Sequence, residues 1–178
     1  MSINLDVLYT LAKVAATLAG FSGVVVGLRL RGASGWSAPE SRILWLLICD
    51  SFLVLFFSLL PVPMALAGWA ESCIWSLCSA LLGTWFVVGN LLALRGERRD
   101  HLARRSIKVP VITPLFRIVF VAALAMGIAL WLAAFDAVVA RGQALYVLGL
   151  IVLLAFASLE FLFFIGLASR PGPDEPER

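Results

Sequence analysis

Five long apolar segments constrain this chain more than any other feature of its sequence. Each is long enough to cross a bilayer as a helix, which takes about 20 residues. The segments are continuous rather than alternating, so they do not fit the strands of a membrane barrel. They therefore predict an all-α, polytopic transmembrane helical bundle of about five spans, at residues 5–28, 43–66, 71–94, 114–138 and 144–168.

Composition supports this fold class and leaves little room for a soluble domain. Hydrophobic residues make up 62% of the 178 residues, only 14% are charged, and the mean hydropathy is +1.00. A soluble domain of this length could not bury so much apolar surface. We expect a single transmembrane domain over residues 1–170, followed by a solvated, disordered tail at 171–178.

The distribution of basic residues predicts the orientation in the membrane. With five spans, the basic loop 95–113 lies on the same side as the loop after the first span and the C-terminus, and the opposite side keeps only Arg141. The positive-inside rule then places the N-terminus outside and the C-terminus inside. An alternative is that the first helix lies along the membrane surface. The basic side chains of the cytoplasmic loop are Arg95, Arg98, Arg99, Arg104, Arg105 and Lys108.

Small side chains form one arc of the first apolar helix when residues 12–27 are placed on a helical wheel. In lipid, small residues let helices approach closely. We expect this face to pack against other helices of the chain, to form a subunit interface or to line a central pore. Lys13 borders the arc, either as a pore charge or as a side chain that snorkels to the headgroups. The candidate interface residues are Ala15, Ala19, Gly20, Gly23 and Gly27.

Two acidic residues, Asp50 and Glu160, lie within the apolar spans. Asn90 and Arg117 fall in the same predicted inner half of the membrane. Ionisable groups at lipid depth are costly unless they are paired or hydrated, and they often mark ion or proton pathways. The four residues predict a polar layer, which is either an ion site reached from the cytoplasm or a structural cluster that fixes the bundle.

Signatures of an enzyme are missing from the sequence. The single histidine, His101, sits in the basic loop, and Cys49, Cys73 and Cys78 have neither metal-ligand nor dithiol spacing. No Gly-rich phosphate loop and no plausible Ser/His/Asp trio occurs. We therefore expect no enzymatic activity, no catalytic residues, no cofactor and no metal site.

Three classes of function fit these features. The first is a homo-oligomeric ion-conducting channel or pore, and the second is a non-catalytic membrane subunit that docks a cytosolic partner through its basic loop. The third is a small proton-coupled transporter. The basic loop also suits anionic lipid headgroups, whereas nucleic acid is a poor partner because the basic residues flank apolar spans. Few Lys against many Arg, Ala and Gly favour a bacterial protein, and hence the bacterial inner membrane.

Overall fold

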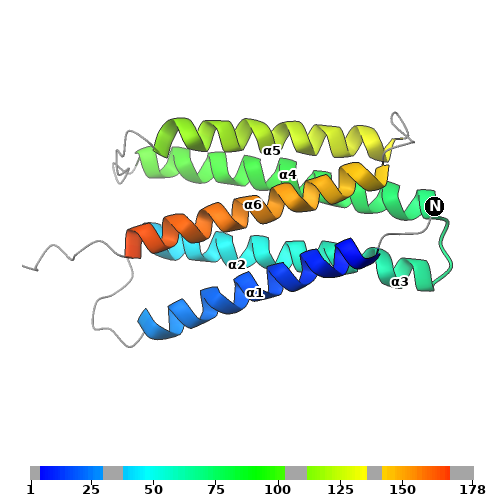
Figure 1. The fold of residues 1–178 in the computed structure, drawn as a ribbon. Coiled ribbons are helices and arrows are strands. Elements are labelled where there is room, and N and C mark those ends of the chain that lie inside the picture. The colour runs from blue at the N-terminus through cyan, green and yellow to red at the C-terminus, as the bar shows by residue number, and fades with distance from the viewer. Residues whose placement is uncertain (1–4, 30–37, 103–111, 136–141, 169–178) are drawn as a thin grey trace, which may run out of the picture. The chain divides into compact units, whose positions relative to one another are not determined.

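A computed structural model describes residues 5–29, 38–102, 112–135 and 142–168, and all regular secondary structure in these ranges is helical. The predicted tail at 171–178 lies outside the described residues. The helices, shown in Figure 1, are α1 (Leu5–Arg29), α2 (Ala38–Leu59), α3 (Pro61–Leu66), α4 (Glu71–Leu102), α5 (Ile112–Ala134) and α6 (Gly142–Ala168).

Five stretches of these helices are long and apolar enough to cross a membrane. This finding confirms the all-helical fold class with five candidate spans, and it indicates an integral membrane protein. The orientation with the N-terminus outside stays a prediction. The stretches are Asp6–Val24, Leu44–Leu66, Glu71–Leu92, Arg117–Ala134 and Gly142–Gly166.

The second span consists of two helical pieces, α2 and α3. Helix α2 ends at Leu59, and Leu60 keeps helical angles (φ −55°, ψ −40°) before Pro61 begins α3. Proline lacks the backbone N–H that would continue the α2 ladder, but it suits the first turn of a new helix. The proline therefore interrupts the hydrogen bonding without ending the span.

A tight turn at Gly68 ends α3. Gly68 has a φ of 77°, a left-handed conformation that favours glycine. Its N–H donates to the carbonyl of Ala65 at 3.0 Å, and the N–H of Trp69 donates to that of Met64 at 3.2 Å. This pair of bonds is the Schellman motif, which satisfies the last carbonyls of the helix and lets the chain turn towards α4.

Helix α4 is longer than its membrane span. It has 32 residues, and the span ends at Leu92, so about 15 Å of helix continues to Leu102. The predicted basic loop 95–113 therefore begins as helix, with Arg95, Arg98 and Arg99 on it. Arg104, Arg105 and Lys108 lie outside the described residues.

The chain divides into two compact units, which are described separately. Unit 1 comprises Met1–Leu59 and Leu153–Arg178, and unit 2 comprises Leu60–Val152, so that the first part of α6 belongs to unit 2 and the rest to unit 1. The single domain predicted over residues 1–170 stays a prediction.

In unit 1, α1 and α2 lie side by side and run antiparallel (Figure 1). Each helix of the unit buries side chains that recur every three or four residues, as packing along one face requires. The buried side chains are Leu8, Leu11, Ala12, Ala15 and Ser22 on α1, Leu47, Ser51, Val54, Phe57 and Ser58 on α2, and Leu153, Ala157 and Phe164 on α6.

In unit 2, α4 and α5 also lie side by side and antiparallel, and they meet closely at two glycines (Figure 1). A Cβ atom added to Gly83 would lie 3.0 Å from the carbonyl oxygen of Gly127, and one added to Gly127 would lie 3.2 Å from that of Gly83. Only hydrogen at these positions lets the two backbones come so close. A Cβ atom added to Gly149 on α6 would lie 3.1 Å from side-chain atoms of both Leu82 and Leu130, so this glycine also allows close packing.

Candidate functional site

The two acidic residues of the spans belong to unit 1 and lie near each other. Asp50 on α2 and Glu160 on α6 are close enough for their charges to interact. Asp50 lies six residues after its span begins at Leu44, and Glu160 lies six residues before its span ends at Gly166. At the helical rise, each acid is about 9 Å from that end of its span. With five spans both ends face the same side of the membrane, so the acids share one depth.

Glu160 faces the interior of unit 1. It lies on the same helix face as Ala157 and Phe164, both of which are fully buried. Leu162 and Ile165, on the other face of α6, are exposed. The Oε2 atom of Glu160 is buried and has no hydrogen-bond partner among the described atoms. The acid therefore points away from the surface that the helix presents to lipid.

Two buried hydroxyls follow the acid pair along α2. Ser51, directly after Asp50, and Ser58, seven residues later on the same face, are both 0% exposed. Neither Oγ atom has a hydrogen-bond partner among the described atoms. Buried polar groups are nearly always hydrogen-bonded to protein or water, so each of these hydroxyls needs a hydrogen-bond partner. Sequence reasoning missed both, because serine is common in membrane helices as a packing residue.

A cysteine completes this group. Cys49 precedes Asp50 on α2, is half-buried, and lies within electrostatic range of both carboxyl groups. Its spacing in the sequence pointed to no role. In the structure it is a thiol beside the acid pair.

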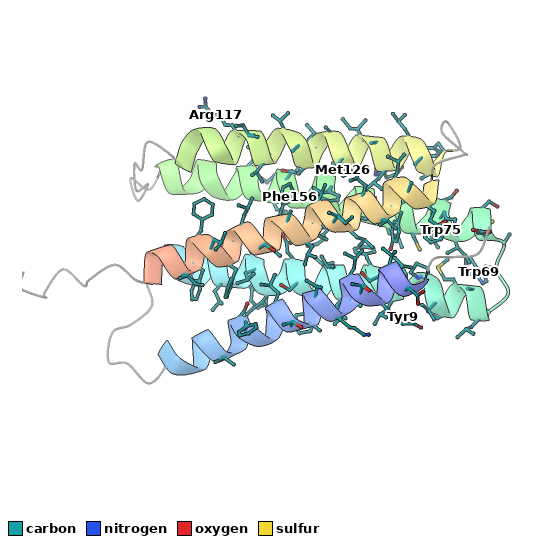
Figure 2. The ribbon with its side chains drawn as sticks, viewed as in Figure 1. Tyr9, Trp69, Trp75, Arg117, Met126 and Phe156 are labelled. Atoms are coloured by element: carbon teal, nitrogen blue, oxygen red, sulfur yellow. The ribbon has the colours of Figure 1, made fainter. Side chains whose placement is uncertain are left out.

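The other two residues of the predicted polar layer, Asn90 and Arg117, lie in unit 2. The Nδ2 group of Asn90 donates to the carbonyl of Phe86 at 2.6 Å, within its own helix. Arg117 is exposed at the first residue of its span, and Figure 2 shows its side chain pointing away from the α4–α5 pair. That these two residues join the acid pair in one layer stays a prediction.

The small-residue arc of α1 divides into two halves. Ala15 is fully buried in unit 1 and Ala19 is partly buried, so this half packs inside the unit. The other half is exposed, and an added Cβ would meet no atom within 4 Å at Gly20, Gly23 or Gly27. The glycines are thus available for a contact outside the unit.

Lys13 is exposed beside this glycine half of the arc. Its carbonyl accepts a hydrogen bond from the Oγ1 atom of Thr17 at 2.8 Å, which satisfies the threonine within the helix. The exposed position fits both interpretations of Lys13 from the sequence.

A second polar group fills the core of unit 2. Cys78 and Tyr146 are both fully buried, and the thiol of Cys78 lies 3.9 Å from the sulfur of Met64. The rings of Trp75 and Tyr146 pack against each other at a centroid distance of 5.7 Å and an interplanar angle of 55°. These neighbours satisfy the polar atoms, so the cluster is explained by packing in the core of unit 2.

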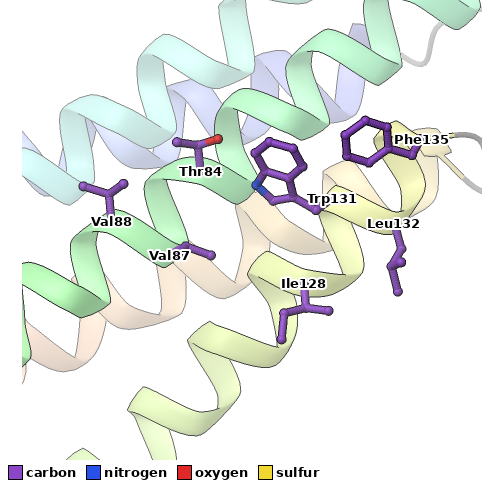
Figure 3. Close-up of a pocket in the computed structure, with 7 residues that line it drawn as sticks. All are labelled: Thr84, Val87, Val88, Ile128, Trp131, Leu132 and Phe135. Atoms are coloured by element: carbon purple, nitrogen blue, oxygen red, sulfur yellow. The ribbon is translucent and has the colours of Figure 1, made fainter.

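A groove lies between α4 and α5, and Figure 3 shows its lining residues. Its volume is about 440 Å³. Its one polar side chain, Thr84, donates its hydroxyl to the carbonyl of Ala80 at 2.7 Å. A groove with such walls suits hydrocarbon and offers nothing to an ion. It is lined by Thr84, Val87, Val88, Ile128, Trp131, Leu132 and Phe135.

Comparison of the chain with protein-family models, curated proteins and solved structures found no match. Among the described residues, no three or more His, Cys, Asp or Glu side chains are grouped so that they could hold a metal ion. The acid pair of unit 1 is therefore the feature of the described chain with the clearest capacity for chemistry.

Proposed function

We propose that this chain is a homo-oligomeric membrane protein that conducts cations or protons, and that the Asp50–Glu160 pair is its ion site. One observation carries the proposal: two carboxyl groups from different helices lie together at one depth, with Glu160 facing the interior. Ionisable groups at this depth are expensive and are enriched in ion and proton pathways.

Electrostatics determines what such a pair binds. Two neighbouring carboxyl groups present oxygen atoms that suit a proton or a cation and repel an anion. We therefore expect selectivity for protons or cations over chloride.

The exposed glycines of α1 support assembly into a homo-oligomer. A glycine face turned towards lipid gains nothing, whereas the same face against a second helix allows close packing. Gly20, Gly23 and Gly27 have that open space within unit 1. A bacterial inner membrane remains the proposed location, from composition alone.

A second candidate function is a non-conducting membrane subunit that docks a cytosolic partner. The continuation of α4 to Leu102 favours it, because this helix carries basic residues beyond the span. Arg95, the described member of this group, is exposed. Such a segment suits an acidic protein surface or anionic headgroups.

Flux measurements on purified protein in liposomes separate the two candidates. Proton, sodium, potassium and chloride fluxes are compared with those of empty liposomes under an imposed membrane potential. We expect cation or proton flux that is lost in Asp50→Asn and Glu160→Gln. The control is Asp6→Asn, which changes an exposed acid in the first turn of α1. Fluxes equal to those of empty liposomes for every ion would reject conduction and favour the membrane subunit.

A further inference from the structure

We infer that unit 2 binds one anionic phospholipid, whose acyl chain lies in the groove between α4 and α5 and whose phosphate group binds Arg95 and Arg117. This inference goes beyond the proposed conduction, and it applies equally to a conducting and a non-conducting chain. Three features carry it: the groove, two exposed arginines, and the helix faces that connect them, all within unit 2.

The groove is almost wholly apolar and lies along the membrane spans of α4 and α5 (Figure 3). Its volume of about 440 Å³ falls within the range of pockets that hold small molecules, about 300–1,000 Å³. The hydroxyl of Thr84 is satisfied within its own helix, so it does not call for a polar ligand. An acyl chain suits such walls, and lipid surrounds the spans.

Each wall of the groove continues along its helix to an exposed arginine. On α4, Arg95 lies eleven residues after Thr84. On α5, Arg117 lies eleven residues before Ile128. Eleven residues make about three helical turns, so each arginine falls on the face that lines the groove. Exposed apolar side chains on these faces, between the groove and the arginines, are Leu91 on α4 and Val121 on α5.

The two arginines lie at the same end of the antiparallel pair and at similar depth. From the close contact of Gly83 with Gly127, Arg95 is twelve residues along α4 and Arg117 is ten residues back along α5. These separations correspond to about 18 and 15 Å of helix. The groove begins at Val88, only about 10 Å from Arg95 along α4. Half of the hydrocarbon core is about 15 Å thick, so an acyl chain from a headgroup at this level extends into the groove.

Two guanidinium groups favour a headgroup of net negative charge. Arginine binds phosphate through paired hydrogen bonds, whereas the ammonium group of a zwitterionic headgroup would be repelled by the guanidinium groups. The axes of packed helices are about 8–10 Å apart, so the long side chains of Arg95 and Arg117 can both reach one headgroup. Figure 2 shows Arg117 pointing outward from the α4–α5 pair, as contact with surrounding lipid requires.

Fluorescence quenching by lipids with brominated acyl chains tests the site, because Trp131 lines the groove. The signal of Trp131 is the difference between the wild type and Trp131→Phe. In phosphatidylcholine vesicles that contain a small share of brominated lipid, brominated phosphatidylglycerol should quench this signal more strongly than brominated phosphatidylcholine. From the shares that give half-quenching, we expect a preference of about 25-fold, or about fivefold for each arginine.

Charge-removing variants test the role of the arginines. Arg95→Gln and Arg117→Gln should each lower the preference about fivefold, and the two changes together should remove it. Lys13→Gln, which removes an exposed charge from α1, is the control and should keep the full preference. Circular dichroism checks that each variant is folded.

Native mass spectrometry of the same proteins gives a second measurement, the number of phosphatidylglycerol molecules retained, which does not depend on Trp131→Phe. We expect one lipid retained by each wild-type protomer and none by the double arginine variant. Equal quenching by the two brominated lipids in the wild type would overturn the phospholipid site and leave the arginines to an acidic protein partner. A preference that survives the loss of both arginines would also overturn the inference, as would retained lipid that leaves Trp131 unquenched.

Discussion

The contact between Gly83 and α5 allows a quantitative prediction for Gly83→Ala. The added Cβ would lie 2.8 Å from Cδ1 of Trp131, 3.0 Å from the carbonyl oxygen of Gly127 and 3.2 Å from Cβ of Leu130. Ordinary carbon contacts are about 3.5 Å or longer, so the Trp131 ring must retreat by about 0.7 Å. A side chain can make that shift, but the carbonyl of Gly127 cannot move unless the helices separate.

The expected cost follows from overpacking and from helix propensity. An extra methyl group in a well-packed site costs about 1–3 kcal/mol. Alanine regains up to about 1 kcal/mol over glycine in a helix. Gly23→Ala should gain the same propensity without the clash, because no atom lies within 4 Å of its added Cβ. The difference in unfolding free energy between the two variants therefore isolates the overpacking cost, about 1–3 kcal/mol.

Reversible unfolding in mixed micelles, followed by circular dichroism, measures this difference. We expect Gly83→Ala to be less stable than the wild type or equal to it, and Gly23→Ala to be at least as stable. Equal stability of the two variants would refute the close crossing of α4 and α5.

Three further predictions concern assembly, orientation and the polar layer. Gly23→Leu should lower the oligomer mass measured in native-like lipid but leave the helicity and stability of the isolated protomer unchanged. Phe21→Leu, the control, should change neither the oligomer mass nor the stability. Loss of the fold in Gly23→Leu would place this glycine inside the protomer instead. Cysteine at position 101 should be labelled in sealed vesicles only after permeabilisation, since labelling from the outer face would reverse the predicted orientation. Arg117→Gln should alter the unfolding free energy by no more than about 0.5 kcal/mol, as for an exposed side chain, and a strong loss of stability would show that Arg117 holds the acid pair in place.

The number and position of the spans follow from the sequence because bilayer thickness sets a minimum length for an apolar helix. The common depth of Asp50 and Glu160 follows from the same counting, since each acid lies six residues from an end of its span. The sequence does not show that the two acids lie on neighbouring faces of α2 and α6, because the rotation of each helix about its axis depends on the helices it packs against.

The packing of glycines shows where sequence reasoning fails. The glycines of α1 form the more conspicuous pattern, yet Gly20, Gly23 and Gly27 are open within unit 1. The close crossing uses Gly83 and Gly127, one from each of two helices, and neither stands out alone. Small residues predict that close contact is possible, but only the paired geometry shows which ones use it.

The serine pair is a similar case. Ser22 and Ser51 are equally buried members of membrane helices. What separates them is that Ser22 bonds to Leu18 while Ser51 leaves its hydroxyl unsatisfied. This distinction depends on side-chain rotamers, which sequence patterns do not contain.

A double-mutant cycle on ion flux tests most directly whether Asp50 and Glu160 act as one site. Flux in liposomes is measured for the wild type, Asp50→Asn, Glu160→Gln and the variant with both changes, each with its fold checked by circular dichroism. Groups that act as a unit give non-additive losses, so either single change should remove nearly all the flux and the double change should remove no more. Losses that multiply in the double variant, or flux that survives both changes, would contradict the account.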